Sequence, residues 1–573
     1  MSAKSKKRRT PEAPPETAAA ASAAPPNSFL ERRAGAVALA LVLLATVRIA
    51  ATYTVFTHTY DEPAHVACGM EWLDRGRYEY EPQHPPLARV AAALGPYLLG
   101  ARAQNTPKEG EFSMTVEGLR ILYGGNRYEK LLSAARMGIL PFFWLACAVV
   151  WWWGVRYFGR LEAMAAVFLF TFLEPVLAHA GLATTDMALT AFLGATFLSG
   201  AIWLEQPSRG RAALFGLCAG LAVVSKYSSL VFFPAAVAIA LAWYYSVDRP
   251  KAGELRMAAM RLLPGLAVAA GIVCIVIAAA FRFSWGNSGI GGLKLPAPEF
   301  FQGIRDVAKH NAEGHPGYLL GKVGRSGFWG YYLVEIAVKT PLPFLFLAGI
   351  GAALLLRRRG AVRFGWLPLA YAAGVLGVAS FGRINIGLRH ILPVYMGLSL
   401  VAAVGACHLW RMAPRRAWAK YALPVALLWF GGASLAAHPD YLPYFNELAG
   451  SHPENILVDS DLDWGQDYKR LATRLRELGV KEVSFLQFAT SDLEGQHGFP
   501  HIVAPNVLGP NYGWNAVNVT TWKERRLGLY DQRPDIKPLW PELFEPTEKV
   551  GKTIYLYYFP PAGSNVPQPR RIR

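Results

Sequence analysis

Residues 34–56 read AGAVALALVLLATVRIAATYTVF, an apolar run with a single charge at Arg48. About 20 apolar residues are enough for a helix to cross a bilayer. Comparable runs recur near 131–153, 161–180, 184–204, 212–225, 229–246, 262–283, 328–356, 366–382, 391–410 and 418–437. The pattern predicts a polytopic α-helical membrane protein with about eleven transmembrane helices.

The composition excludes a soluble enzyme and a disordered chain. Of the 573 residues, 53% are hydrophobic and only 17% are charged, and the mean hydropathy is +0.22. Soluble domains carry about 25% charged residues. The five cysteines are scattered, so neither a disulfide framework nor a zinc site is indicated.

Basic residues fall mainly on one side of the predicted membrane. That side receives the basic positions within 4–9, 32–33, 156–160, 209–211, 249–261, 357–363 and 411–420. Short loops on the other side carry Lys226, Arg383 and Arg389 only. The positive-inside rule makes the basic side cytoplasmic. The rule also accounts for much of the net charge of +18, so no nucleic-acid partner is expected.

This topology divides the chain into three parts. Residues 1–33, rich in Ala, Pro and basic residues, are expected to form a disordered cytoplasmic tail. Residues 34–437 form the transmembrane domain, with large outward-facing loops at 57–130 and 284–327. Residues 438–573 face outward, with a helix predicted at 467–478 and strands at 481–488 and 552–558. They form either a small α/β domain or an incomplete one that leans on the membrane part.

The first outer loop opens with an acidic pair, Asp61-Glu62, directly after the first apolar run. Carboxylates at a membrane edge can serve as a general base or as metal ligands. The alternative is a helix start, because Asp61 followed by Pro63 is a good N-cap pattern.

The same loop contains His84-Pro85-Pro86-Leu87-Ala88-Arg89. The two prolines restrict the backbone before a short apolar stretch, 88–99, which we expect to lie on the membrane surface. His84 and Arg89 could meet an anionic head group, and the alternative for this motif is a rigid turn.

Together the two motifs resemble the first outer loop of the protein O-mannosyltransferase family and its bacterial relatives. These enzymes, including the aminoarabinose transferases of glycosyltransferase family 39, share the class C membrane fold. Arg89 stands where the mannosyltransferases usually have lysine. The large lumenal β-trefoil insert of the eukaryotic members is missing, which puts a protein acceptor in doubt. Further stretches similar to bacterial members are Ala183–Asp186, Ser225–Tyr227, Lys339–Pro343 and Asn385–Pro393.

The resemblance implies roles for several residues. Asp61 would be the general base, and Glu62 would orient it or bind a metal. Lys226, Arg389, His390 and Arg136 would neutralise a leaving phosphate, since arginine offers forked contacts and lysine a point charge. His84, Pro85, Pro86, Arg89 and Asp186 would shape the substrate site. Plainer roles remain open: Arg136 can snorkel from a helix end, Lys226 can be a turn lysine, and Asp186 can cap a helix.

An acidic stretch at 459–467, DSDLDWGQD, looks like a calcium loop. However, Trp464 stands at the position that requires glycine, and Arg470 stands where glutamate is needed. The stretch also contains Asp-x-Asp, but the tail is too short for a nucleotide-sugar fold. We expect a structural or acceptor-facing loop.

The sequence therefore predicts a class C glycosyltransferase of the plasma (inner) membrane. Its partners would be a polyprenyl-phosphate sugar donor and a lipid, glycan or protein acceptor at the outer face. No cofactor is certain, although a divalent metal is possible. The alternatives are a transporter or flippase, or an assembly subunit without catalytic activity. Transporters tend to show internal repeats and interrupted helices around a midplane site. No convincing repeat is found in this sequence, and the ionisable residues gather at one face rather than midway.

Overall fold

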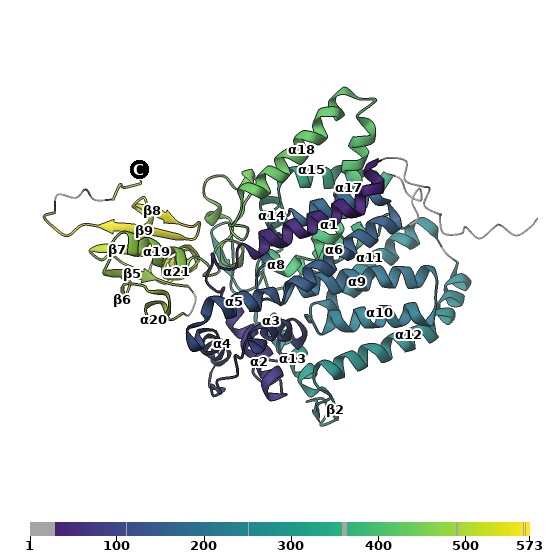
Figure 1. Cartoon of the computed structure of the whole chain (residues 1–573), viewed down its shortest axis with the longest axis horizontal. Helices are drawn as coiled ribbons and strands as arrows, with labels where there is room; N and C mark the ends of the chain where they lie inside the picture. Colours follow the sequence, from purple (N-terminus) through teal and green to yellow (C-terminus); the bar gives the residue numbers. More distant parts are fainter. Residues whose placement is uncertain are drawn as a thin grey trace, which may run out of the picture.

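A computed structural model describes residues 29–573, except 111, 250, 358–363, 489–490, 565–566, 568 and 573. Long helices form most of the molecule, and a small β-sheet with its own helices lies at one end of them (Figure 1). The predicted disordered tail lies outside the described residues up to position 28. Residues 29–33 belong to the first helix rather than to a tail.

Helices occupy every apolar run found in the sequence. The helices of the membrane part are α1 (Phe29–Ala50), α5 (Tyr128–Met137), α6 (Leu140–Tyr157), α7 (Arg160–Thr171), α8 (Glu174–Ala180), α9 (Asp186–Glu205), α10 (Arg209–Val223), α11 (Ser229–Asp248), α12 (Ala252–Ala280), α14 (Tyr331–Lys339), α15 (Leu342–Arg357), α16 (Leu367–Ser380), α17 (Val394–Met412) and α18 (Ala417–Ala436).

Fewer helices are suited to cross a membrane than there are apolar runs in the sequence. Among the described residues, seven helical spans are long and apolar enough to cross a membrane, or up to nine if two bent pairs are included. The pairs α7–α8 and α14–α15 bend by 67° and 116°, so two expected straight spans are interrupted. Pro175 and Pro341 lie beside these breaks, where proline cannot donate a helical hydrogen bond. With 15 and 14 residues, α10 and α16 are short for a full crossing.

The outer surface of the helices has the character of a lipid-facing surface. Only 6% of the apolar window in α12 and 11% of that in α11 is buried inside the protein. Leu263 and Ile275 of α12 are about 60% exposed. So much exposed apolar surface is exceptional for a soluble protein but ordinary for a helix in lipid.

Shorter elements cover one end of the helices. The first outer loop folds into α2 (Glu62–Met70), α3 (Pro86–Leu98) and α4 (Ser113–Tyr123). As predicted, Pro85 precedes α3 in an extended conformation. The second outer loop contains two small hairpins and an amphipathic helix: β1 (Trp285–Asn287), β2 (Lys294–Pro296), α13 (Pro298–Glu313), β3 (Gly317–Leu319) and β4 (Lys322–Gly324).

The C-terminal part is built on a mixed five-stranded sheet of order β6-β5-β7-β9-β8. The predicted helix and two strands are present as α19 (Tyr468–Glu477), β5 (Glu482–Leu486) and β9 (Ile554–Phe559). Ile554 and Leu556 face the core that α19 covers, whereas Tyr557 and Phe559 face a second core on the opposite side. Elements that the sequence pattern missed are α20 (Leu493–His497), β6 (His501–Val503), β7 (Gly513–Asn518), α21 (Val519–Gln532) and β8 (Glu548–Val550).

Candidate active site

A cavity of about 620 Å³ lies where the outer loops meet one end of the helices. One part of its wall is polar and charged, with Asp61, Lys226 and Arg389 among its residues. Apolar lining comes from the start of α11, the middle of α13 and the end of α16: Leu230, Val231, Phe232, Ile304, Val307, Ala308, Val378, Ala379 and Phe381. The cavity therefore combines charged and apolar walls.

Asp61 lies at the N-cap position of α2, but its side chain does not cap the helix. Instead, its Oδ2 accepts a hydrogen bond from Nη1 of Arg389 at 2.6 Å. The side chain is 27% exposed and lines the cavity. The position matches the predicted helix start, whereas the contacts of the carboxylate are those of a cavity group.

Glu62 is fully buried and its two oxygens are saturated. Arg136 donates to both oxygens at 2.8 Å, and the backbone N–H groups of Thr59 and Ala183 donate as well. Burial alone would raise the pKa of Glu62, but the guanidinium and these hydrogen bonds hold it below its usual range. Glu62 thus has no oxygen left for a substrate or a metal, and does not line the cavity.

Arg136 is placed differently from the expectation. It is 1% exposed, and beyond Glu62 it donates to the carbonyls of Tyr53, Phe56 and Thr57. It neither lines the cavity nor snorkels to the surface. Arg136 is therefore not placed to bind a phosphate in this cavity, and Glu62 is not placed to act on a substrate there. Their ion pair ties the start of the first outer loop to α5.

The other predicted phosphate ligands do come together. Lys226 lines the cavity and donates to Asp186 Oδ1 at 2.6 Å. The side chain of Arg389 is 12% exposed, and its Nη2 donates to none of the described residues. His390 also lines the cavity, and burial together with the Lys226 ammonium lowers its pKa to about 3. His390 can therefore offer a hydrogen bond but no charge.

The His84–Arg89 motif divides into a cavity side and a buried side. His84 lines the cavity, and Leu87 N donates to the Val224 carbonyl beside the Lys226 turn. Arg89 is 1% exposed and turns inward, where it pairs with Glu81 and donates to Nδ1 of His65. Arg89 is thus not placed to meet a head group directly, because its contacts organise the loop that presents His84.

Three further histidines line the cavity and were missed in the sequence: His65, His310 and His315. Burial and the Arg89 charge keep the pKa of His65 well below its usual value, so this ring is neutral. Because Nδ1 accepts from Arg89, its proton lies on Nε2. Burial, followed by His310, lowers the pKa of His315 to about 4. His65 follows Asp61 by four residues, which places both on one helix face and could have revealed it.

No metal site is evident in the part of the chain that the structure describes. No group of three or more His, Cys, Asp or Glu side chains there is arranged to hold a metal ion. The residues present therefore do not fit the divalent metal that the resemblance allowed, and Glu62 is already satisfied by protein donors.

The acidic segment 459–467 is a buried structural element. Asp463 accepts from the N–H groups of Gly465 and Thr520, and Asp467 accepts from Thr553 and Arg470. Burial raises the pKa of Asp463 to about 7 and that of Asp467 to about 6. The carboxylates turn into the protein rather than toward a common ion.

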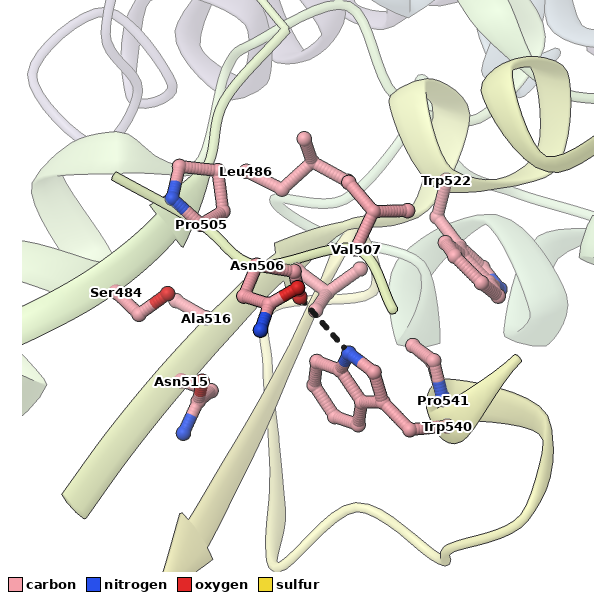
Figure 2. Close-up of a pocket in the computed structure, with 11 residues that line it drawn as sticks. Ser484, Leu486, Pro505, Asn506, Val507, Asn515, Ala516, Trp522, Trp540 and Pro541 are labelled. Carbon is pink, nitrogen blue, oxygen red and sulfur yellow. Dashed lines mark hydrogen bonds between the residues drawn. The ribbon is translucent and has the colours of Figure 1, made fainter. Parts of the chain in front are cut away.

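Two tryptophans of the C-terminal part, Trp522 and Trp540, pack in its core. Figure 2 shows a small pocket beside β5 and β7, where Trp540 Nε1 donates to the Asn506 carbonyl at 3.1 Å. Its volume is about 10 Å³, which is the space of about one water molecule. Trp522 and Trp540 are 3% and 7% exposed, so neither offers a free ring face.

Comparison with known proteins gives a likeness of fold. No protein-family model matches the sequence, and no curated protein does. Apo ArnT from Cupriavidus metallidurans is 15% identical, covering 91% of this chain and 98% of that chain, with a TM-score of 0.48. ArnT bound to undecaprenyl phosphate is 14% identical over 90% and 97%, also at 0.48. The Archaeoglobus fulgidus oligosaccharyltransferase AglB, with an inhibitory peptide and a dolichol-phosphate, is 14% identical over 78% and 58%, at 0.40.

These similarities are distant, so the function of the cavity rests on the side chains of this chain.

Proposed function

We propose that this protein transfers a sugar from a polyprenyl-phosphate carrier to an acceptor hydroxyl at the outer face of the membrane. The observation that carries the proposal is the lining of one cavity by both apolar residues of α11, α13 and α16 and the charged residues Asp61, Lys226 and Arg389. A lipid-linked sugar phosphate likewise combines an apolar chain with an anion and a polar sugar.

The cationic side chains of the cavity are suited to bind a phosphate leaving group. Lys226 contributes a charge, and Arg389 keeps Nη2 available for a phosphate oxygen while Nη1 holds Asp61. Charge-assisted hydrogen bonds of this kind are the strong ones. The neutral His390 adds a hydrogen bond without adding charge. Neutralised phosphate is a good leaving group, so the sugar–phosphate bond can break without a general acid.

Asp61 supplies the base. The acceptor oxygen forms a bond to sugar carbon one as the bond from that carbon to the phosphate oxygen breaks. The acceptor proton passes to the Asp61 carboxylate, and the electron pair of the broken bond leaves on the polyprenyl phosphate. A single displacement predicts inversion at the anomeric carbon.

A transporter or flippase is the rival function. The bent pairs α7–α8 and α14–α15 are interrupted helices of the kind that transporters contain. Transport sites, however, lie near the midplane between repeats, whereas this cavity is lined by outer loops and helix ends. Lys339, next to the second break, donates to the carbonyls of Leu442 and Asp461, which is a structural use of its charge.

Donor binding tests the proposal. The purified protein in lipid nanodiscs, incubated with lipid extract, should retain a polyprenyl-phosphate sugar that native mass spectrometry detects. Arg389→Ala should weaken donor binding by about 10- to 150-fold, because a charge-assisted contact worth roughly 1.5–3 kcal/mol is lost.

Arg383→Ala is the matched control, because Arg383 lies six positions away and is exposed. Donor affinity of that variant should stay within about twofold of wild type. A wild-type protein that retains no polyprenyl-phosphate lipid, or an Arg389→Ala variant that binds it normally, would contradict the proposed donor site.

A further inference from the structure

Residues 460–466, a segment of the C-terminal part, hold the loop that carries Arg389. They contact its backbone on both sides of Gly387. Ser460 Oγ donates to the Ile386 carbonyl at 2.7 Å, and the Leu388 N–H donates to Asp461 Oδ1 at 3.0 Å. Between them, Gly387 has φ +86°, and a Cβ there would collide with Ser460 Oγ. The close approach requires glycine.

The same segment also holds the loop that carries Asp61. The Thr57 N–H donates to the Gln466 carbonyl at 3.0 Å, and the Tyr60 N–H donates to the Trp464 carbonyl at 3.1 Å. The 460–466 segment therefore connects two loops that are more than 300 residues apart in sequence. These are the two loops whose side chains form the Asp61–Arg389 ion pair.

Trp464 makes the closest link to the site. Its ring lies against the Arg389 guanidinium, with 4.2 Å from the guanidinium carbon to the ring centroid. The indole is 1% exposed and does not line the cavity. A guanidinium held on an aromatic face is attracted by the ring quadrupole, and the planar group is thereby kept in one orientation.

We propose that the 460–466 segment is a positioning element of the active site, in which Trp464 holds the Arg389 guanidinium between Asp61 and the donor phosphate. This inference rests on the proposed function, since it gives the phosphate contact of Arg389 a specific orientation. Trp464 touches neither the substrate nor the cavity and acts through Arg389. The C-terminal part is then required for the transferase site itself, and not only for acceptor binding.

The test is a double-mutant cycle read as donor affinity. Trp464→Leu should weaken binding of a polyprenyl phosphate by about 3- to 30-fold, the range expected for loss of a cation–π contact. In an Arg389→Ala background the same change should cost less than about twofold, because the partner of the ring is gone. Equal losses in both backgrounds would show that Trp464 serves the fold only.

Trp464→Leu could fail to fold, so a second series keeps the ring. Fluorinated tryptophans at position 464 retain the shape of the indole while withdrawing electron density from its face. The dissociation constant of the polyprenyl phosphate should rise stepwise with the number of fluorines. A flat series would overturn the proposal whether or not the leucine variant folds.

Trp540→Leu is the control for general destabilisation. Trp540 is also a buried tryptophan of the C-terminal part, packed on Tyr557 and Phe559 away from the cavity. Its loss should lower the unfolding temperature and leave donor affinity unchanged. A wild-type protein that binds no polyprenyl phosphate contradicts the proposed function, whereas normal wild-type binding with unaffected Trp464 variants contradicts only this inference.

Discussion

The first outer loop and the 459–467 segment both bring carboxylates next to the Arg389 loop, and they use them in opposite ways. In the first outer loop, Asp61 faces the cavity with an arginine as its partner. In the 459–467 segment, Asp461, Asp463 and Asp467 are at most 1% exposed and accept hydrogen bonds from the surrounding protein. One region presents a carboxylate to the cavity, and the other directs its carboxylates into the protein.

The difference shows that acidic residues in a motif do not indicate chemistry by themselves. Even within one dipeptide, Asp61 lines the cavity whereas Glu62 is saturated by Arg136 and two backbone N–H groups. What separates them is whether an oxygen remains for a substrate.

The first outer loop and the 459–467 segment must lie on the same, outer side of the membrane. Cysteine labelling tests this topology with an all-or-none result. Position 481 is exposed on the surface of the C-terminal part. Lys481→Cys should react with a membrane-impermeant maleimide added to intact cells. Any outer membrane is permeabilised first. Arg209→Cys, at the exposed first residue of α10, should react only after the bilayer is broken. Protection of position 481 from the outside reagent would overturn the topology.

Asp61→Asn should abolish transfer by about 100-fold or more while leaving folding and donor binding intact. Asparagine keeps an oxygen that can accept from Arg389, yet it cannot take a proton. The rate of sugar transfer and the donor affinity should be measured on the same preparation. A folded variant with near-normal turnover would remove Asp61 from the mechanism without affecting the fold.

Glu62→Gln should act on stability instead. The change breaks a buried ion pair and leaves Arg136 without its carboxylate, which costs roughly 3–5 kcal/mol. Thermal unfolding in detergent should show a clear drop, while transfer per folded molecule should fall far less than in Asp61→Asn. Glu129→Gln is the matched control, since Glu129 is 48% exposed and its pair with Lys469 should be worth about 0–1 kcal/mol. Equal destabilisation in both variants would contradict the difference between the buried and the exposed pair.

The helices of the membrane part could be predicted, because apolar runs are local properties of the sequence. The breaks within α7–α8 and α14–α15 were missed although Pro175 and Pro341 lie beside them. Of the five strands of the C-terminal sheet, only β5 and β9 were predicted. Its β6 and β8 are three-residue strands, too short for an alternating pattern to be visible.

The candidate site could be predicted as a set of residues but not as a geometry. Asp61, Lys226 and Arg389 do share a cavity, although the sequence placed Arg136 and Arg89 with them. These two arginines point into the protein because the buried Glu62 and the partly buried Glu81 lie where their side chains end. The role of Trp464 depends on contacts across more than 70 residues of sequence, and no local pattern reveals such contacts.

The smallest expected effect concerns Glu524 of α21, which lies near the 459–467 carboxylates. Burial, followed by the charges of Asp459 and Asp463, raises the pKa of Glu524 from 4.5 to about 8. Between these values the folded protein keeps a proton that the unfolded chain releases, so stability falls as the pH rises through this window. Asp459 and Asp463 have pKa values raised to about 6 and 7 and act in the same direction.

Between about pH 7 and 8.5, Glu524→Gln should therefore show a flatter decline of the unfolding temperature than wild type, and exposed Glu482→Gln should follow wild type. Hydrogen exchange in α21 should change in parallel, and identical pH profiles for all three proteins would show that Glu524 is already ionised in the folded state.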